Sequence, residues 1–343
     1  MASGASRDDL ERAVAAGVID RAAADRLAAF WSTTAEPESY GGEDEQLRLV
    51  TGFGDIFVAI GIVLFLGALV FLTDGGGWLI PGGAVAVAAW VLAELFTRIR
   101  RQALPSILLL LAFASSVFIG VTAVFSRQTD AGAIAAGGLA TCAAVALHWW
   151  RFRVPVTVAA ACAAATAVLV GGLESVFPNI ITGLGGLIFL PIGLAVFVLA
   201  MVFDTSDRER RTRRTDIAFW LHALAAPMVV HPVMQNIIKG ETPGPVEAAL
   251  TLLVFIGLSL VALTIDRRAV LVSSLLYLGY AIYSVLSAGN ALPSTSMVVL
   301  LVGAVVLAMS FAWRPLRAGL LKLLPATISN RVPPAHLAPL KAN

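Results

Sequence analysis

Long apolar runs dominate the chain from residue 53 onward. They cover residues 53–73, 77–96, 104–126, 131–150, 154–173, 180–203, 216–238, 247–265, 269–288 and 293–313. A run of about 20 apolar residues matches the thickness of a bilayer core. Each run is too long for a buried strand and too apolar on all sides for a surface helix. The pattern predicts an all-α fold, a polytopic transmembrane helix bundle of about ten spans.

The first 52 residues follow a different pattern, in which apolar positions recur at helical spacing among charged residues. Residues 1–32 are predicted to form a short cytoplasmic helical hairpin. Gly17 separates its two helices, and Asp20 is placed to cap the second. Residues 33–52 are acidic and contain Pro37, which is typical of a flexible linker.

The segment after the last apolar run is basic. Residues 314–324 carry Arg314, Arg317 and Lys322 among leucines, which favours a basic amphipathic segment on the inner membrane surface. The remaining residues to 343 contain four prolines and are predicted to form a disordered cytoplasmic tail.

The distribution of charge predicts an orientation. Charged residues make up 13% of the chain, against about 25% in soluble domains. Fifteen basic residues follow the even-numbered runs and two follow the odd-numbered runs. Since positive residues remain in the cytoplasm, both termini are predicted to be cytoplasmic, which requires an even number of spans. The predicted location is a cell (inner) membrane.

The same features exclude several function classes. The basic residues lie in short loops rather than on one folded face, which argues against nucleic-acid binding. Cys142 and Cys162 lie inside apolar runs, so neither a disulfide framework nor a metal site is indicated. No nucleophile elbow, zinc-protease or phosphate-loop motif occurs. No cofactor and no catalytic residue is predicted, and an enzyme is the less favoured class.

The seventh run carries most of the polar chemistry at membrane depth, where polar side chains are functional-site candidates by default. Its polar residues are His222, His231, Gln235 and Asn236, and its predicted helix kinks are Pro227 and Pro232. Each proline frees a carbonyl one turn earlier.

The spacing of the two histidines limits what they can do together. Nine residues on a straight helix separate them by roughly 13.5 Å and half a turn, so His222 and His231 are not expected to share a metal ion. Either histidine could contact a substrate or move a proton. The favoured interpretation is a hydrogen bond to a freed carbonyl or to a neighbouring helix.

The ninth run contains a second polar pattern. Hydroxyl side chains spaced 4, 3, 4 and 3 residues apart share one helix face; they are Ser273, Tyr277, Tyr280, Ser284 and Ser287. They either wall a polar cavity with the seventh run or join helices by hydrogen bonds. The second interpretation is favoured.

The other ionisable groups lie near the ends of runs and are interpreted as anchors. Glu94 and Arg98 suit a local ion pair, Asp266 abuts Arg267, and His148 precedes two tryptophans in an expected interfacial belt.

Small residues suggest which helices lie inside. The fourth and fifth runs are rich in Ala and Gly, and glycines recur over residues 183–186 of the sixth, which predicts close helix packing in the interior. The leucine-rich third and eighth runs are expected to face lipid.

Two segments carry a family resemblance. LERAVAAGVIDRAAADRLAAFW, followed by GFGDIFVAIGIVLFLGALVF, resembles the uncharacterised bacterial membrane proteins grouped as the DUF2157 family. That resemblance implies a bacterial inner-membrane protein. The family has no established activity, so no functional residue is transferred.

Two functions remain open from the sequence. The first is a small-solute or proton-linked transporter of unknown substrate, suggested by polar residues at membrane depth. The second is a non-transporting membrane scaffold or regulator whose residues 7–32 recruit a cytoplasmic protein. The sequence leans to transport.

Overall fold

The computed structural model describes residues 10, 13–34, 53–75, 77–125, 131–207, 210, 212–238, 244–288, 294–329 and 332, and the structural statements below concern these residues. Every regular element among them is a helix, which confirms the all-α prediction. The chain divides into two compact units, Met1–Asp44 with His336–Asn343, and Glu45–Ala335. Each is described by itself.

The described part of the first unit ends in α2 (Arg21–Thr34). Asp20 caps this helix by accepting a hydrogen bond from the backbone N–H of Ala23 (2.5 Å). Gly17, with φ +68°, makes the turn before it, as predicted. Leu10 and Ala24 are buried. The predicted linker over residues 33–52 lies almost wholly outside the described residues.

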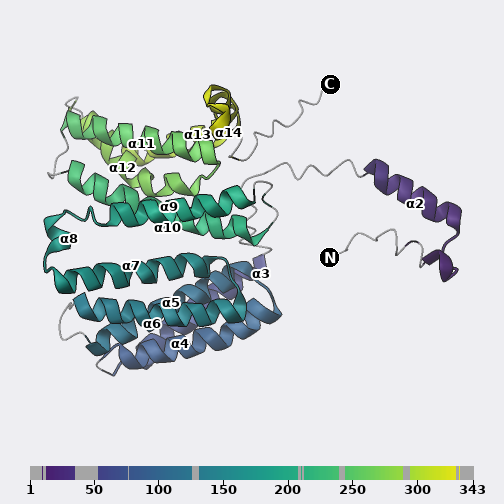
Figure 1. Ribbon diagram of the computed structural model, residues 1–343, viewed down its shortest axis with the longest axis horizontal. Coiled ribbons are helices and arrows are strands. Elements are labelled where there is room, and N and C mark those ends of the chain that lie inside the picture. The colour runs from purple at the N-terminus through teal and green to yellow at the C-terminus, as the bar shows by residue number, and fades with distance from the viewer. Residues whose placement is uncertain are drawn as a thin grey trace. The chain divides into compact units, whose positions relative to one another are not determined.

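The second unit is the helix bundle (Figure 1). Its helices are α3 (Phe53–Leu72), α4 (Leu79–Ala93) with the π-helix η1 (Glu94–Ile99), α5 (Ala103–Phe125), α6 (Ala131–Phe152), α7 (Val156–Val176), α8 (Ile180–Gly183), α9 (Phe189–Ser206), α10 (Arg213–Ile237), α11 (Pro245–Ile265), α12 (Ala269–Ala288), α13 (Thr295–Leu323) and α14 (Ala326–Ser329).

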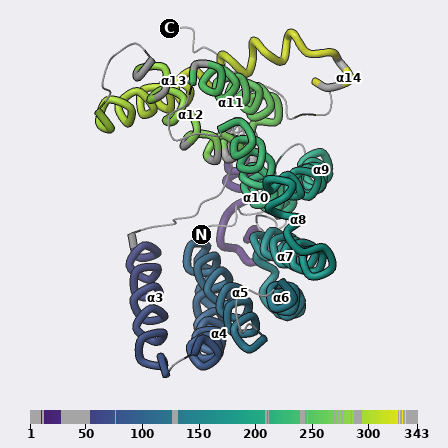
Figure 2. Tube along the Cα trace, turned by 90° about the vertical axis from the view of Figure 1, so that its left-hand side faces the viewer, coloured from purple at the N-terminus to yellow at the C-terminus, as the bar shows by residue number. Residues whose placement is uncertain are grey.

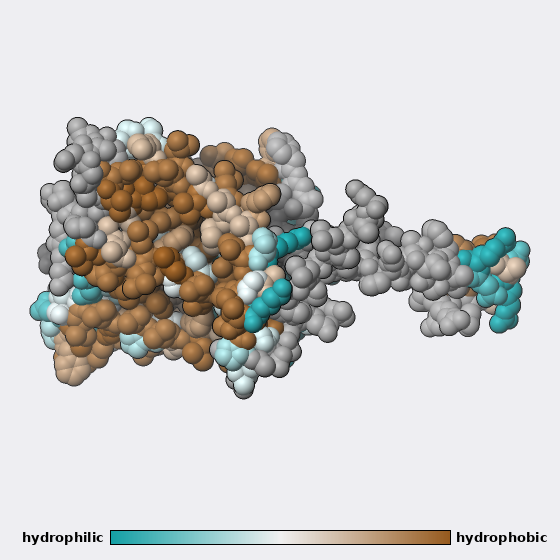
Figure 3. Space-filling view, turned by 90° about the horizontal axis from the view of Figure 1, so that it is seen from above, coloured by the Kyte–Doolittle hydropathy of each residue, from teal (hydrophilic) through white to brown (hydrophobic). Residues whose placement is uncertain are grey.

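The long helices follow the predicted spans in the same order along the chain. Among the described residues, nine helices are long and apolar enough to cross a membrane. The helix at the remaining predicted span, α12, is 20 residues long, or about 30 Å. Large apolar side chains such as Phe71 and Phe311 are exposed. Figure 3 shows a broad hydrophobic face with hydrophilic residues toward its ends. The protein is an integral membrane protein.

The helices form two groups joined at α7 and α10. Helices α3 to α7 pack together, and α9 to α13 form the second group, with α10 in contact with α7, α9 and α12 (Figure 2). The most extensive packing is α6 on α7 in the first group and α9 on α10 in the second.

Polar contacts bring the arginine-rich connections together at one end of the bundle. Arg151 in the last turn of α6 pairs with Glu94 at η1 (2.7 Å). Gln102 after η1 donates to Asp55 in the first turn of α3 (2.8 Å). The other arginine-rich connections follow α9 and α11, and they also meet each other here, as described below. We call this the arginine-rich end. The bundle begins at this end with α3 and finishes there with the last turns of α13.

Helices α6 and α7 approach as closely as their small residues predict. A Cβ built on Gly138 would lie 2.9 Å from the carbonyl oxygen of Ala164, and one on Gly171 would lie 2.7 Å from that of Ala131. The prediction for the leucine-rich third run is wrong. Leu109 and Leu110 of α5 are fully buried, because α3, α4 and α6 all pack against this helix.

The sixth run is not one helix over 180–203 as predicted. It breaks into α8, which lies at the end opposite the arginine-rich end, and α9 (Figure 1). Gly185 (φ +54°) and Gly186 (φ +73°) adopt left-handed conformations between the two helices, which glycine tolerates without steric cost. These glycines therefore turn the chain, and their predicted role in helix packing is wrong.

Residues 314–323 are not a separate segment on the membrane surface. They continue α13, a helix of 29 residues that contains Pro315. Arg317 is buried and its Nε donates to the carbonyl oxygen of Leu263 (3.1 Å), so this residue is drawn to α11 and not to lipid. The predicted disordered tail begins instead with the short helix α14 (Ala326–Ser329), and nearly all of it after Ser329 lies outside the described residues.

Candidate functional site

A buried charged cluster joins α9, α10 and the α11–α12 connection. Asp204, near the end of α9, accepts hydrogen bonds from His222 of α10 and from Arg267 of the connection. His222 Nε2 lies 2.8 Å from Asp204 Oδ2, and Arg267 Nε lies 3.3 Å from the same oxygen. Arg267 Nη2 bonds the other carboxylate oxygen. We call these three residues the Asp204 cluster.

The cluster is closed off from its surroundings. The side chains of His222 and Arg267 are 0% exposed and that of Asp204 is 5% exposed. The ring of Phe197 meets His222 edge-on, with centroids 5.2 Å apart. Arg267 Nη2 also donates to the carbonyl oxygen of Thr215 (3.2 Å). A buried charge is tolerated only when it is paired in this way.

The geometry assigns one proton on His222. An ionised carboxylate can only accept hydrogen bonds, so Nε2 carries a proton and donates it to Asp204. The other ring nitrogen, Nδ1, is buried and has no hydrogen-bond partner among the described residues, and the same holds for Arg267 Nη1. A buried polar atom left unpaired costs about 1–3 kcal/mol. In the neutral ring, Nδ1 of His222 has a lone pair facing the interior.

The connection that carries Arg267 is tied to two other segments, the α9–α10 connection and α13. Asp266 adopts φ +58° after α11, and its carboxylate pairs with Arg210 Nη1 (3.1 Å). It also accepts a hydrogen bond from Trp313 Nε1 of α13 (2.8 Å) and lies 3.5 Å from Arg317 Nε. Since basic groups at the carbonyl end of a helix are favourable, these contacts fix the α11–α12 connection and with it the position of Arg267.

Arg210 connects this network to the chain between α9 and α10. Its Nη2 donates to the carbonyl oxygens of Ile265 (3.2 Å) and Asp266 (3.0 Å). Burial, and then the nearby positive charge of Arg267, lower the pKa of the Arg210 guanidinium from its ordinary value, while Asp266 opposes the shift. The arginines here form a dense positive network that the two aspartates, Asp204 and Asp266, hold together.

The sequence identifies only one member of the Asp204 cluster. His222 is predicted from its depth in the seventh run, whereas Asp204 follows the predicted end of the sixth run and is not among the predicted residues. Arg267 is predicted only as a neighbour of Asp266. In the structure, Asp266 points to Arg210 while Arg267 bonds Asp204. The available signal is a carboxylate directly after an apolar run, in a stretch to residue 214 that also contains two further carboxylates and five arginines.

A second polar set lies in the last two turns of α10, away from the arginine-rich end. Gln235 Nε2 donates to His231 Nε2 (2.9 Å), which leaves His231 Nδ1 to donate to the hydroxyl of Tyr277 on α12. His231 and Gln235 are exposed. The ninth-run stripe therefore faces α10 at Tyr277. The side chains of Ser273, Ser284 and Ser287 lie outside what the structure describes.

The other predicted residues of this region have separate positions. Asn236 Nδ2 donates to the carbonyl oxygens of Gly185 (2.9 Å) and Pro232 (2.8 Å), and so holds the turn after α8. The hydroxyl of Tyr280 is buried without a partner among the described residues. Helix α10 continues through Pro227 and Pro232. The predicted polar residues thus occupy more than one place: His222 belongs to the Asp204 cluster, and His231, Gln235 and Tyr277 form the second set.

His148 differs from its predicted place in an interfacial belt. It is 1% exposed and packs among the rings of Phe113, Trp90 and Phe152, with the Phe152 centroid 4.6 Å away. Glu94 and Arg98 form the expected pair (3.6 Å), but the shorter contact of Glu94 is with Arg151.

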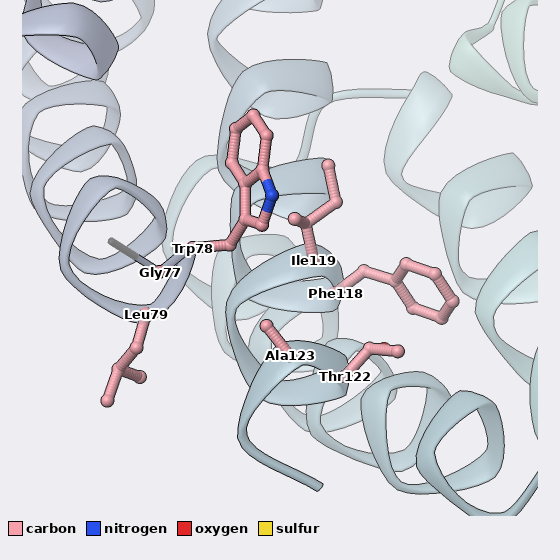
Figure 4. Close-up of a pocket in the computed structure, with 7 residues that line it drawn as sticks. All are labelled: Gly77, Trp78, Leu79, Phe118, Ile119, Thr122 and Ala123. Atoms are coloured by element: carbon pink, nitrogen blue, oxygen red, sulfur yellow. The ribbon is translucent and has the colours of Figure 1, made fainter. Parts of the chain in front are cut away.

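Two open cavities lie outside both polar sets. One, of about 470 Å³, is mostly apolar; Trp78 at the start of α4 and residues of the last turns of α5, among them Phe118 and Thr122, surround it (Figure 4). The other, of about 510 Å³, lies at the arginine-rich end between the α6–α7 connection and the start of α10. Neither is lined by His222, His231 or Tyr277.

The part of the chain that the structure describes contains no group of three or more His, Cys, Asp or Glu side chains that could hold a metal ion. The Asp204 cluster has one carboxylate, one imidazole and one guanidinium, which suits the transfer or storage of a proton better than the binding of a metal.

The chain matches no protein-family model, no curated protein and no solved structure.

Proposed function

We propose that this protein is a proton-linked membrane transporter and that the Asp204 cluster is its proton-responsive site. The observation that carries the proposal is Nδ1 of His222, which has no hydrogen-bond partner in the described part of the chain and is buried beside an aspartate that His222 shares with Arg267. A proton on this nitrogen adds a positive charge to a closed site that already holds a guanidinium.

That added charge has a structural consequence. With His222 neutral, the charges of Asp204 and Arg267 balance. With His222 charged, the carboxylate of Asp204 is paired with two cations. The cluster then has a net positive charge, whose burial costs a large free energy. The cost falls if Arg267 moves away from Asp204 toward water. Protonation of His222 would thereby change how the α11–α12 connection is held against α9 and α10, which is the two-state element that alternating access requires.

The location of the cluster supports this role. Helix α10 contacts α7 of the first group of helices as well as α9 and α12 of the second, so a shift at His222 reaches both groups. Ionisable residues within spans are rare and commonly mark proton or substrate paths. The substrate would be a small solute.

The orientation of the protein in the membrane follows from the distribution of its positive residues. Because positive residues remain in the cytoplasm, we propose that the arginine-rich end faces the cytoplasm, with both termini there. Residence in a bacterial inner membrane rests on the resemblance to the DUF2157 family.

Proton entry into proteoliposomes tests the proposal. Purified protein is reconstituted around a trapped pH-sensitive dye, and an inward proton gradient is applied with and without small amines, amino acids or sugars. The variant His222→Gln keeps a nitrogen that can donate to Asp204 but cannot take up a proton. We expect proton entry with wild type and with the control His231→Gln, and none above protein-free vesicles with His222→Gln. Equal entry with wild type and His222→Gln, or none with wild type, would contradict the proposal.

A second candidate function is a scaffold, in which the N-terminal hairpin recruits a partner. The observation in its favour is the division of the chain into two units, with α2 outside the bundle unit. The two functions differ in what residues 1–34 do. Their deletion leaves proton entry unchanged if the bundle transports by itself, whereas the scaffold predicts a changed set of crosslinked proteins in cells.

A further inference from the structure

The cavity of about 510 Å³ at the arginine-rich end has an almost wholly apolar wall, and three arginines are among the residues that surround it. The transport proposal does not use this cavity. Its wall consists of Trp149, Arg153, Thr212, Arg213, Arg214 and Ile217. The first two residues belong to the end of α6 and the connection after it, and the others to the start of α10. We call this cavity the α6–α10 groove.

Positive charge around the groove is not neutralised by the residues of its wall. Arg153, Arg213 and Arg214 are exposed, and none forms an ion pair with a described carboxylate. The nearest described carboxylates along the chain are engaged or set back. Asp207 accepts hydrogen bonds from the N–H and hydroxyl of Thr212 and from Thr215, and Asp216 is half-buried. Arg213 and Arg214 also stand in the first turn of α10, where the helix dipole adds positive potential.

The depth of the groove identifies the kind of anion. It lies where two membrane-spanning helices end, which is the level of lipid headgroups. Trp149 is half-buried in its wall, and tryptophan prefers this interfacial level because its ring is apolar and its N–H is polar. Arginine side chains bind phosphate through paired hydrogen bonds. Basic pockets between spanning helices on the cytoplasmic side suit anionic headgroups.

We propose that the α6–α10 groove binds an anionic phospholipid, with the glycerol and upper acyl region against its apolar wall at Trp149 and the exposed Arg153, Arg213 and Arg214 around it as ligands of the phosphate headgroup. A lipid held there bridges the two groups of helices, because α6 belongs to the first and α10 to the second. This inference does not depend on transport.

Lipid binding by the full chain in detergent tests the proposal. Native mass spectrometry measures phosphatidylglycerol and phosphatidylcholine bound by wild type, by a groove variant (Arg153→Gln, Arg213→Gln and Arg214→Gln) and by a matched control (Arg98→Gln, Arg100→Gln and Arg101→Gln). The control removes the same charge from another arginine-rich connection and also contains one residue, Arg101, with the φ of +54° that Arg153 has.

We expect the groove variant to lose roughly tenfold in bound phosphatidylglycerol, as the loss of charged hydrogen bonds implies, with phosphatidylcholine unchanged and the control close to wild type. Equal losses in both variants would overturn the proposal, because they indicate general attraction to surface charge. Displacement of the lipid by an equal concentration of inorganic phosphate would also overturn it in favour of a free anion. If the groove variant does not fold, Arg213→Gln and Arg214→Gln, each made singly, give the same comparison against Arg100→Gln.

Discussion

Arg267, in the connection between α11 and α12, donates to Asp204 near the end of α9, and the two side chains are 0% and 5% exposed. The pair joins segments 63 residues apart in the sequence. Because His222 shares the same carboxylate, three parts of the second group of helices depend on a single buried aspartate.

The first prediction concerns the stability of this pair. Asp204→Asn leaves Arg267 buried without a counter-charge, which costs about 3–5 kcal/mol. The double variant Asp204→Leu with Arg267→Met replaces the pair by apolar side chains and should recover most of that loss. Equilibrium unfolding in mixed micelles measures both.

The double variant also separates structure from function. It should be folded and yet show no proton entry in proteoliposomes, since His222 then lacks its aspartate. A double variant that is as unstable as Asp204→Asn would argue against the pairing described here.

The second prediction concerns Asp266, which combines a left-handed backbone (φ +58°) with contacts to Arg210 and Trp313. Asp266→Asn tolerates this φ and keeps an acceptor for Trp313, so its loss of stability should be the smallest. Asp266→Gly keeps the backbone but loses the contacts. Asp266→Ala loses the contacts and adds about 1–2 kcal/mol of backbone strain, so it should unfold first. Thermal unfolding in detergent gives the order, and Ala equal to Asn would contradict it.

The third prediction concerns the contact of α6 with α7. Gly138→Ala would place a Cβ 2.9 Å from the backbone of α7, so it should destabilise the bundle by about 1–3 kcal/mol through overpacking. A Cβ added at Gly172 would meet nothing within 4 Å, so Gly172→Ala should be neutral or add up to about 1 kcal/mol through helix propensity. Equal effects of the two variants on unfolding would mean that α6 and α7 are further apart than described.

The fourth prediction separates the two polar sets of α10. Tyr277→Phe removes the hydroxyl that His231 contacts. This contact is exposed, so the loss of stability should stay below about 1 kcal/mol, and proton entry should match wild type. A loss of proton entry with Tyr277→Phe would move the proton path to the second set.

Much of the fold could be predicted because each span can be recognised from its own residues. A run such as 53–73 is apolar by itself, and Gly17 and Asp20 mark a turn and a cap from their own side chains. The broken sixth run could not be predicted, since its residues are apolar enough for a span. The run is interrupted at Gly185 and Gly186, which adopt left-handed conformations. A hydrogen bond from Asn236 of α10 to the carbonyl oxygen of Gly185 holds this turn in place.

The candidate site was harder to predict because its three residues come from separate parts of the chain. His222 was visible because a histidine within a span is unusual. Asp204 and Arg267 each stand next to a helix end in a charged stretch, where the sequence favours an exposed anchor. Their burial is a property of tertiary packing, in which α9, α10 and the α11–α12 connection meet. No local sequence pattern indicates that these three parts of the chain pack together.

The protonation of His222 tests the central claim most directly. Full-length protein with ¹⁵N-labelled histidine in lipid bilayers is measured by solid-state NMR, with His222→Gln used to assign the signal. In alkaline solution the account predicts a neutral ring with its proton on Nε2. On acidification, Nδ1 should gain a proton over the pH range in which proton entry into proteoliposomes appears. A His222 ring that carries its neutral proton on Nδ1, or one that stays neutral while proton entry proceeds, would contradict the account.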